Sequence, residues 1–218
     1  MTDARDTVLA SIRRSLRRAG PLEASVAAVL AARTAAHAAH VQPRVSEDAV
    51  QRFQEKFEAA GGLVSVVPSF AEVPRALMEH LRAYALPPAA VMGTDELLSA
   101  IPWPNELATE RRAATGEDRV SITTAFAAAA ETGTLALLSS PESPTTLNFL
   151  TDDHVVVLPA ARVVVHLEEI WSRLREAFPA LPRTVNLISG PSKTADVEQT
   201  LQQGAHGPRR LLVILVQG

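Results

Sequence analysis

Cysteine is absent from all 218 residues of the sequence. Without thiolates, the chain forms no disulfide bond and holds no iron–sulfur cluster through cysteines of its own. Long apolar runs are also missing, since none approaches the roughly 20 residues that a membrane-spanning helix needs. The sequence therefore predicts neither a membrane span nor a cysteine-ligated cluster.

A strong excess of charge is missing as well. The formal net charge is −3, so we expect no nucleic-acid partner, because proteins that bind nucleic acids usually carry a strongly basic face. The first residues, MTDARDTVLASIRRSLRRAG, contain arginines but no apolar signal core, and Asp3 and Asp6 do not fit a transit peptide. We predict a cytoplasmic protein.

Two parts of different composition follow one another. Residues 1–45 predict an N-terminal helical arm, because Leu9, Ile12 and Leu16 recur at helical spacing and an alanine-rich stretch follows. Residues 46–218 are predicted to form an α/β domain. The arm holds few large apolar side chains, so we expect it to dock on this domain or on another subunit. A homo-oligomer is one of these alternatives.

Helices and strands are predicted to alternate after residue 46. The expected strands are 63–67, 89–93, 119–122, 134–140, 154–159, 184–189 and 211–216. The expected helices are 47–60, 70–83, 94–100, 123–130, 166–177 and 194–203, with an irregular, proline-interrupted segment at 101–118. Several strands are continuous apolar runs, which indicates burial on both faces. The pattern predicts a three-layer α/β/α fold with a mainly parallel sheet.

The segment Ala130–Ser140, AETGTLALLSS, contains the first candidate site. Gly133 suits the positive φ of a helix C-cap, and Thr134 suits the first residue of a strand. Glu131 is not explained in this way, since a carboxylate after the preceding predicted helix would face the negative end of its dipole. We therefore predict Glu131 as a catalytic residue, with Thr132, Gly133 and Thr134 as ligand-binding residues.

The second candidate lies in ISGPSKTADVEQTL, residues 188–201. Free amides at the start of the predicted helix, with the hydroxyls of Ser192 and Thr194, would suit a small carboxylate or phosphate. The segment is not a P-loop, because Ser192 stands where the Walker pattern requires glycine. Ordinary helix capping is the alternative. The ligand-binding candidates are Gly190, Ser192 and Thr194.

Histidines supply the remaining candidates. His206 lies between two glycines in QQGAHGPRR, and a histidine side chain can act as a catalytic acid or base near neutral pH. A simple surface role is the alternative for a histidine in a loop. His37 and His40 have the spacing of ligands on one helix face, but no third ligand is near them in the sequence. No metal site is therefore predicted.

Three segments resemble a known family: AETGTLALLSSPESPTTLNFL, ISGPSKTADVE and GAHGPRRLLVILV. Together they resemble the LUD-domain family, in particular its lactate-utilisation protein C branch, although Thr151 stands where a proline is common. The resemblance implies a three-layer fold similar to ribose-5-phosphate isomerase and CoA transferases. It also implies a subunit of a complex that oxidises L-lactate to pyruvate beside iron–sulfur partner proteins.

Two other functions stay open. The chain could act alone as an enzyme on small organic acids, sugar phosphates or thioesters, with Glu131 as base or nucleophile and the loop at 190–194 holding an anion. It could also be a non-catalytic assembly protein. No GxGxxG pattern follows an expected strand, so no dinucleotide cofactor is supported, and we predict none of any kind.

The positions of the motifs raise a geometric question. Ser192 follows its predicted strand, whereas Glu131 and His206 precede theirs. In an all-parallel sheet, these residues would lie at opposite edges. Unless one strand is antiparallel, or the loop at 203–210 spans part of the distance between the edges, the motifs therefore predict two sites rather than one.

Overall fold

The computed structural model describes residues 3–18, 20–36, 41–45, 48–194, 202–204 and 206–218. The chain divides into two units, Met1–Gln42 and Pro43–Gly218. The first contains two helices with no buried residue, α1 (Ala4–Ser15) and α2 (Ala24–Ala35). Its docking on another surface stays a prediction.

The second unit is built on a six-stranded sheet with the order β1-β12-β7-β4-β2-β3, and every pair in it is parallel. In chain order the strands are β1 (Leu63–Val67), β2 (Ala89–Met92), β3 (Ala108–Arg111), β4 (Val120–Thr124), β7 (Asp153–Pro159) and β12 (Arg210–Val216). The apolar runs of β7 and β12 lie side by side within this sheet and are buried on both faces.

A second, four-stranded sheet has the order β8-β5-β6-β9. Its strands are β5 (Ala127–Ala129), β6 (Thr134–Leu138), β8 (Val163–Val164) and β9 (Val185–Ile188). Strand β6 is antiparallel to both of its neighbours, β5 and β9. A short antiparallel pair follows, formed by β10 (Lys193–Thr194) and β11 (Gln202–Gln203).

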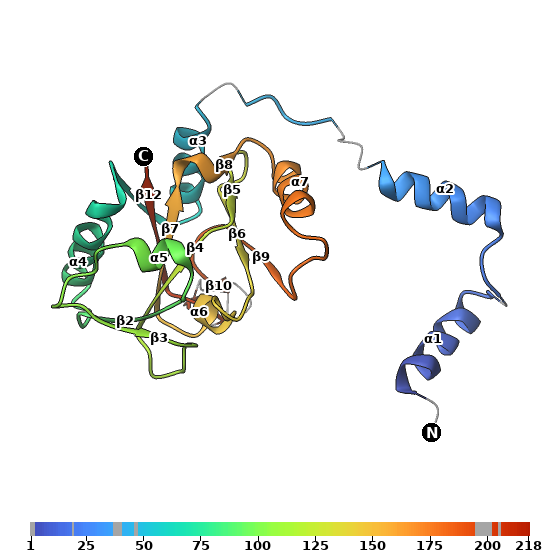
Figure 1. Ribbon diagram of the computed structural model, residues 1–218, viewed down its shortest axis with the longest axis horizontal. Coiled ribbons are helices and arrows are strands. Elements are labelled where there is room, and N and C mark those ends of the chain that lie inside the picture. The colour runs from blue at the N-terminus through green and yellow to red at the C-terminus, as the bar shows by residue number, and fades with distance from the viewer. Residues whose placement is uncertain (1–2, 19, 37–40, 46–47, 195–201, 205) are drawn as a thin grey trace. The chain divides into compact units, whose positions relative to one another are not determined.

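Helices cover both sides of these sheets. One face of the main sheet packs against α4 (Val73–Ala83), which follows the 3-10 turn η1 (Phe70–Glu72), and against α5 (Glu96–Ala100). The other face packs against α3 (Ala49–Ala59) and the second sheet. Helix α7 (Leu167–Ala177) covers the outer face of the second sheet, so α4 and α7 lie on opposite sides in Figure 1. The predicted three-layer α/β/α fold with a mainly parallel sheet is confirmed.

Two short elements complete the unit, α6 (Thr146–Phe149) and the 3-10 turn η2 (Ala160–Arg162). The predicted strands and most predicted helices are found, with bounds that agree within about two residues. Among the described residues, no helix has the length and apolar character required to cross a membrane.

The helix predicted at 123–130 is wrong. This segment contains the end of β4 and the whole of β5, whose three alanines are fully buried. Alanine has the highest helix propensity, but propensity is weak compared with tertiary packing. Here the small side chains allow the main sheet to pack on one face of β5 and α7 on the other.

Two further predictions need correction. The helix predicted at 194–203 is wrong at both of its ends, where β10 pairs with β11, and residues 195–201 lie outside the described part of the chain. The segment 101–118 was expected to be irregular, but it contains β3, an edge strand paired with β2. Proline at 102 and 104 precedes this strand and does not interrupt it.

Candidate functional site

Glu131 holds the start of α7. One carboxylate oxygen, Oε1, accepts a hydrogen bond from the Leu167 amide at 2.7 Å, and Oε2 accepts one from Nδ1 of His166 at 2.9 Å. Because Leu167 is the first residue of α7, the carboxylate lies at the positive end of that helix dipole. The expectation of an unfavourable position after a helix is therefore wrong, since β5 and not a helix precedes Glu131.

The ionised form of Glu131 is favoured by these contacts. Burial by itself raises the pKa of the carboxyl group, but the hydrogen bonds from His166 and the Leu167 amide outweigh it. The pKa of Glu131 consequently lies below its ordinary value. At neutral pH the residue is a carboxylate with a structural partner on each oxygen.

Substitution of Glu131 by glutamine is expected to lower the free energy of unfolding by about 1 kcal/mol, because it removes a negative charge from the start of α7. Thermal or urea unfolding at neutral pH measures this. The matched control is Glu168→Gln, which removes an exposed acid from the same first helical turn. An equal loss in both variants would contradict the specific capping role.

A chain of hydroxyl groups joins the ETGT segment to the end of β9. Thr132 Oγ1 is hydrogen-bonded to Thr134 Oγ1 at 2.7 Å, and Thr134 Oγ1 to Ser189 Oγ at 2.7 Å. The chain forms because β6 and β9 are antiparallel, so the start of one strand lies beside the end of the other. The ETGT segment and the end of β9 therefore lie at the same edge, because these two strands are antiparallel and not parallel.

Gly133 and Gly190 have a packing role. Both have positive φ, 64° and 81°. A Cβ atom at Gly133 would lie 2.5 Å from the amide nitrogen of Phe57, and one at Gly190 would lie 2.8 Å from the carbonyl oxygen of Ala60. The two turns therefore pack closely against α3 and the residue that follows it, which requires glycine at both positions.

The second and third motifs lie against each other. The Ser192 amide donates to the Pro208 carbonyl oxygen at 3.0 Å, and the Gly204 amide donates to the Ser192 carbonyl oxygen at 3.0 Å. Together these loops surround a pocket of about 180 Å³. Its lining consists of Phe149, Ile188, Gly190, Ser192, His206, Gly207 and Pro208.

The structure thus brings Gly190, Ser192 and His206 together, with His206 exposed at this pocket. The imidazole and the Ser192 hydroxyl can exchange protons or hydrogen bonds with a small ligand there. Glu131 does not line the pocket, and the side chain of Thr194 lies outside the described atoms. The predicted roles of all these residues stay predictions.

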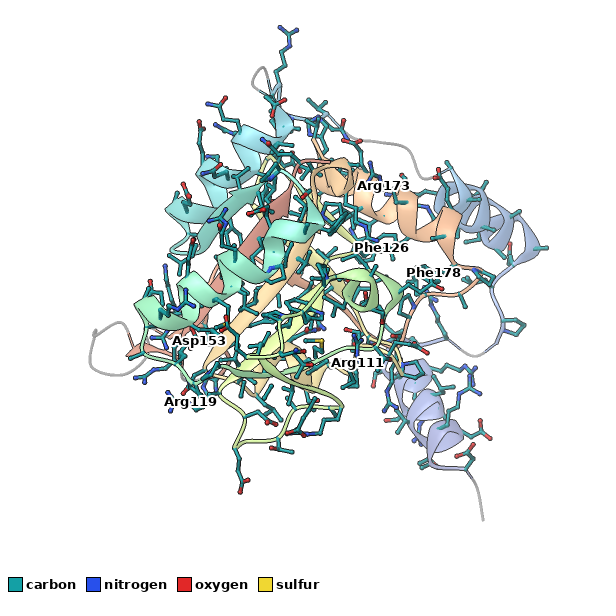
Figure 2. All side chains as sticks on the ribbon, turned by 60° about the vertical axis from the view of Figure 1, so that its left-hand side comes forward. Arg111, Arg119, Phe126, Asp153, Arg173 and Phe178 are labelled. Carbon is teal, nitrogen blue, oxygen red and sulfur yellow. The ribbon has the colours of Figure 1, made fainter. Side chains whose placement is uncertain are left out.

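An ionic cluster at the amino edge of the main sheet was missed by the sequence reasoning. The fully buried Asp153, the first residue of β7, accepts hydrogen bonds from His80 Nε2 at 3.0 Å and from two nitrogens of Arg210 at 2.6 Å each. The Arg210 guanidinium also lies 4.7 Å from the centre of the Tyr84 ring. An acidic residue directly before an apolar run was the available signal. Figure 2 labels Asp153.

The described residues give no evidence for a metal site. Among the residues that the structure describes, no group of three histidine, aspartate or glutamate side chains is placed to hold a metal ion. His37 and His40 lie outside the described residues.

Comparison with known proteins shows which family this chain matches. Residues 50–216 match the LUD domain. The chain is 40% identical over 87 residues to an uncharacterized protein of Neisseria meningitidis, a match that covers 40% of this chain and 37% of that protein. It is 36% identical over 101 residues to lactate utilization protein C of Exiguobacterium sp., covering 44% of each.

A third relative is lactate utilization protein C of Geobacillus thermodenitrificans, 30% identical over 117 residues, covering 52% of this chain and 49% of that protein. The matches thus span about half or less of the length of these relatives. A crystal structure of a DUF162 family protein from Deinococcus radiodurans is similar with a TM-score of 0.60 and 20% identity, covering 80% of this chain and 99% of that one. At this identity the likeness concerns the fold alone.

Proposed function

The chain belongs to the LUD-domain family, and on that premise we propose that it is a subunit of a cytoplasmic complex that oxidises L-lactate to pyruvate. The observation that carries the proposal is its similarity to two proteins named lactate utilization protein C. Both matches cover more than two fifths of this chain.

Iron–sulfur proteins are the proposed partners. Oxidation of lactate to pyruvate releases two electrons and two protons, so the complex needs an electron carrier. The sequence has no cysteine, and protein-bound iron–sulfur clusters are held mainly by cysteine thiolates. In this proposal the clusters lie on other chains and accept the electrons there.

The pocket beside His206 is the proposed ligand site within this function. Its size, about 180 Å³, suits a small carboxylate or phosphate group. We assign His206 as an acid or base and Ser192 as a hydrogen-bonding residue. Glu131 is retained as a catalytic candidate through its contact with His166, and residues 1–45 as an arm that binds a partner protein or a second copy of the chain.

Growth tests this proposal. A strain of the source organism that lacks the gene is expected to lose growth on L-lactate as sole carbon source and to keep growth on pyruvate. A plasmid copy of the gene restores growth, and a copy with His206→Ala restores it poorly if the assigned role is right. Normal growth of the deletion strain on L-lactate would contradict the proposal.

A further inference from the structure

A second pocket lies where the carboxyl edge of the main sheet meets the end of β6 in the second sheet. Ligands of parallel α/β folds usually bind at the carboxyl edge. Residues that follow or end four strands surround it. Asp95 follows β2, Thr124 ends β4, Leu138 ends β6, and Arg162 follows β7. The pocket holds about 290 Å³, close to the lower limit of roughly 300 Å³ for small-molecule sites. It shares no lining residue with the pocket beside His206.

The positive charge of Arg162 is only partly compensated. Its Nη1 donates to the carbonyl oxygen of Ala125 at 2.6 Å, and no carboxylate of the described residues forms an ion pair with it. Burial lowers the pKa of Arg162, against a smaller opposite effect of Asp95. A guanidinium has five N–H donors, so an anion that enters the pocket gains a charged partner.

The negative charge in the lining belongs to Asp95. Its Oδ1 accepts a hydrogen bond from the Leu98 amide at 3.1 Å, whereas Oδ2 is buried without a hydrogen-bond partner among the described residues. Leaving a buried carboxylate oxygen unpartnered is unfavourable. A donor group on a ligand that reaches this oxygen removes the penalty.

The third part of the lining is apolar. The rings of Phe126 and Phe178 lie with their centroids 5.9 Å apart (Figure 2), and Leu138 lines the same pocket. Apolar surface on a ligand is stabilised when it leaves water and packs against these side chains. A cation, a carboxylate and an apolar wall therefore surround one small volume.

We propose that this pocket binds a small carboxylic acid that also carries a hydroxyl or ammonium group and an apolar side chain. The carboxylate pairs with Arg162, the hydroxyl or ammonium group donates to Asp95, and the side chain packs on Phe126 and Phe178. The inference rests on the pocket alone and not on the proposed role in lactate oxidation.

Calorimetric titration of the full chain with three acids of one shape tests the proposal. L-3-Phenyllactate carries the hydroxyl group, L-phenylalanine carries the ammonium group, and 3-phenylpropionate carries neither. At least one of the first two is expected to bind at millimolar concentration or below, roughly tenfold more tightly than 3-phenylpropionate. The stronger of the two identifies the donor group.

Matched variants assign the binding to this pocket. Arg162→Gln is expected to weaken binding by roughly tenfold or more, whereas Arg173→Gln, which removes a charge near the pocket but not in its lining, leaves it unchanged. Asp95→Asn is expected to reduce the preference of the pocket for the acid with the donor group over 3-phenylpropionate. Its control is Asp48→Asn, which alters a similar helix-capping aspartate on α3.

The proposal is overturned if none of the three acids binds the intact protein at millimolar concentration. It is also overturned if Arg162→Gln binds with unchanged affinity. Circular dichroism establishes that each variant is folded. If Arg162→Gln does not fold, Asp95→Asn decides: an unchanged preference for the acid with the donor group then contradicts the proposed site.

Discussion

Replacement of Asp153 by asparagine is expected to lower the free energy of unfolding by about 3 kcal/mol or more. The carboxylate is completely buried and holds both His80 and Arg210. An asparagine amide would direct N–H groups at one of these donors and would leave the Arg210 charge without its partner. Burial raises the pKa of Asp153, but the hydrogen bonds from His80 and Arg210 outweigh it and hold the pKa below its ordinary value.

Urea unfolding at neutral pH measures this loss. The control is Asp118→Asn. Asp118 accepts two hydrogen bonds of 2.7 Å each from Arg112, and two more from the amide and the hydroxyl group of Thr115. That pair lies nearer the surface, with 38% of the Arg112 side chain exposed, so we expect a clearly smaller loss. Equal losses in the two variants would show that burial of Asp153 adds nothing to its effect.

Acid is expected to destabilise the protein strongly through His154. This side chain is fully buried in β7, with Nε2 hydrogen-bonded to Thr123 Oγ1 at 2.7 Å and with Nδ1 lacking a partner among the described residues. Burial lowers the pKa of His154 to about 3. The folded state therefore keeps a neutral imidazole at pH values where the unfolded chain, with a pKa of about 6.5, binds a proton.

The sign of the effect follows from this difference in proton binding. The contribution of His154 to stability is complete above pH 6.5 or so and is lost as the pH falls from there toward 3, by about 5 kcal/mol in total. Between about pH 7.5 and pH 5, where carboxyl groups titrate little, the loss is about 2 kcal/mol.

Urea unfolding over that pH range, compared with the variant His154→Gln, isolates the contribution. Glutamine keeps a polar group for Thr123 but does not titrate, so its stability is expected to change less with pH. His206→Ala serves as the control, since it removes a histidine that is exposed and not buried in the sheet. If the free energy of unfolding changed equally with pH in His154→Gln and in the unaltered protein, the assignment of this pH dependence to His154 would be contradicted.

The main sheet was predictable because its signal is local. Uninterrupted runs such as HVVVLP and LLVILV can be stable only where both faces are covered, and the structure buries them in β7 and β12. The segment AFAAAA misled the prediction, because alanine favours a helix in isolation and nothing in its neighbours reveals the packing of β5 between two layers.

The candidate site was only partly predictable because its contacts join distant positions. The loops of His206 and Ser192 meet through a backbone hydrogen bond, whereas an all-parallel sheet would have placed these two residues at opposite edges. The partners of Glu131 are 35 and 36 positions away, and those of Asp153 are 73 and 57 positions away. Pairings of this kind depend on the strand order and on the antiparallel direction of β6, which the apolar pattern does not specify.

Lactate oxidation in a cell extract tests the central claim most directly. An extract of a strain that lacks the gene is expected to show little reduction of an electron-accepting dye with L-lactate, and addition of the purified chain is expected to restore it. The purified chain alone is expected to give none, since its electrons must pass to partner proteins. Dye reduction at the normal rate without the chain, or by the chain alone, would contradict the account.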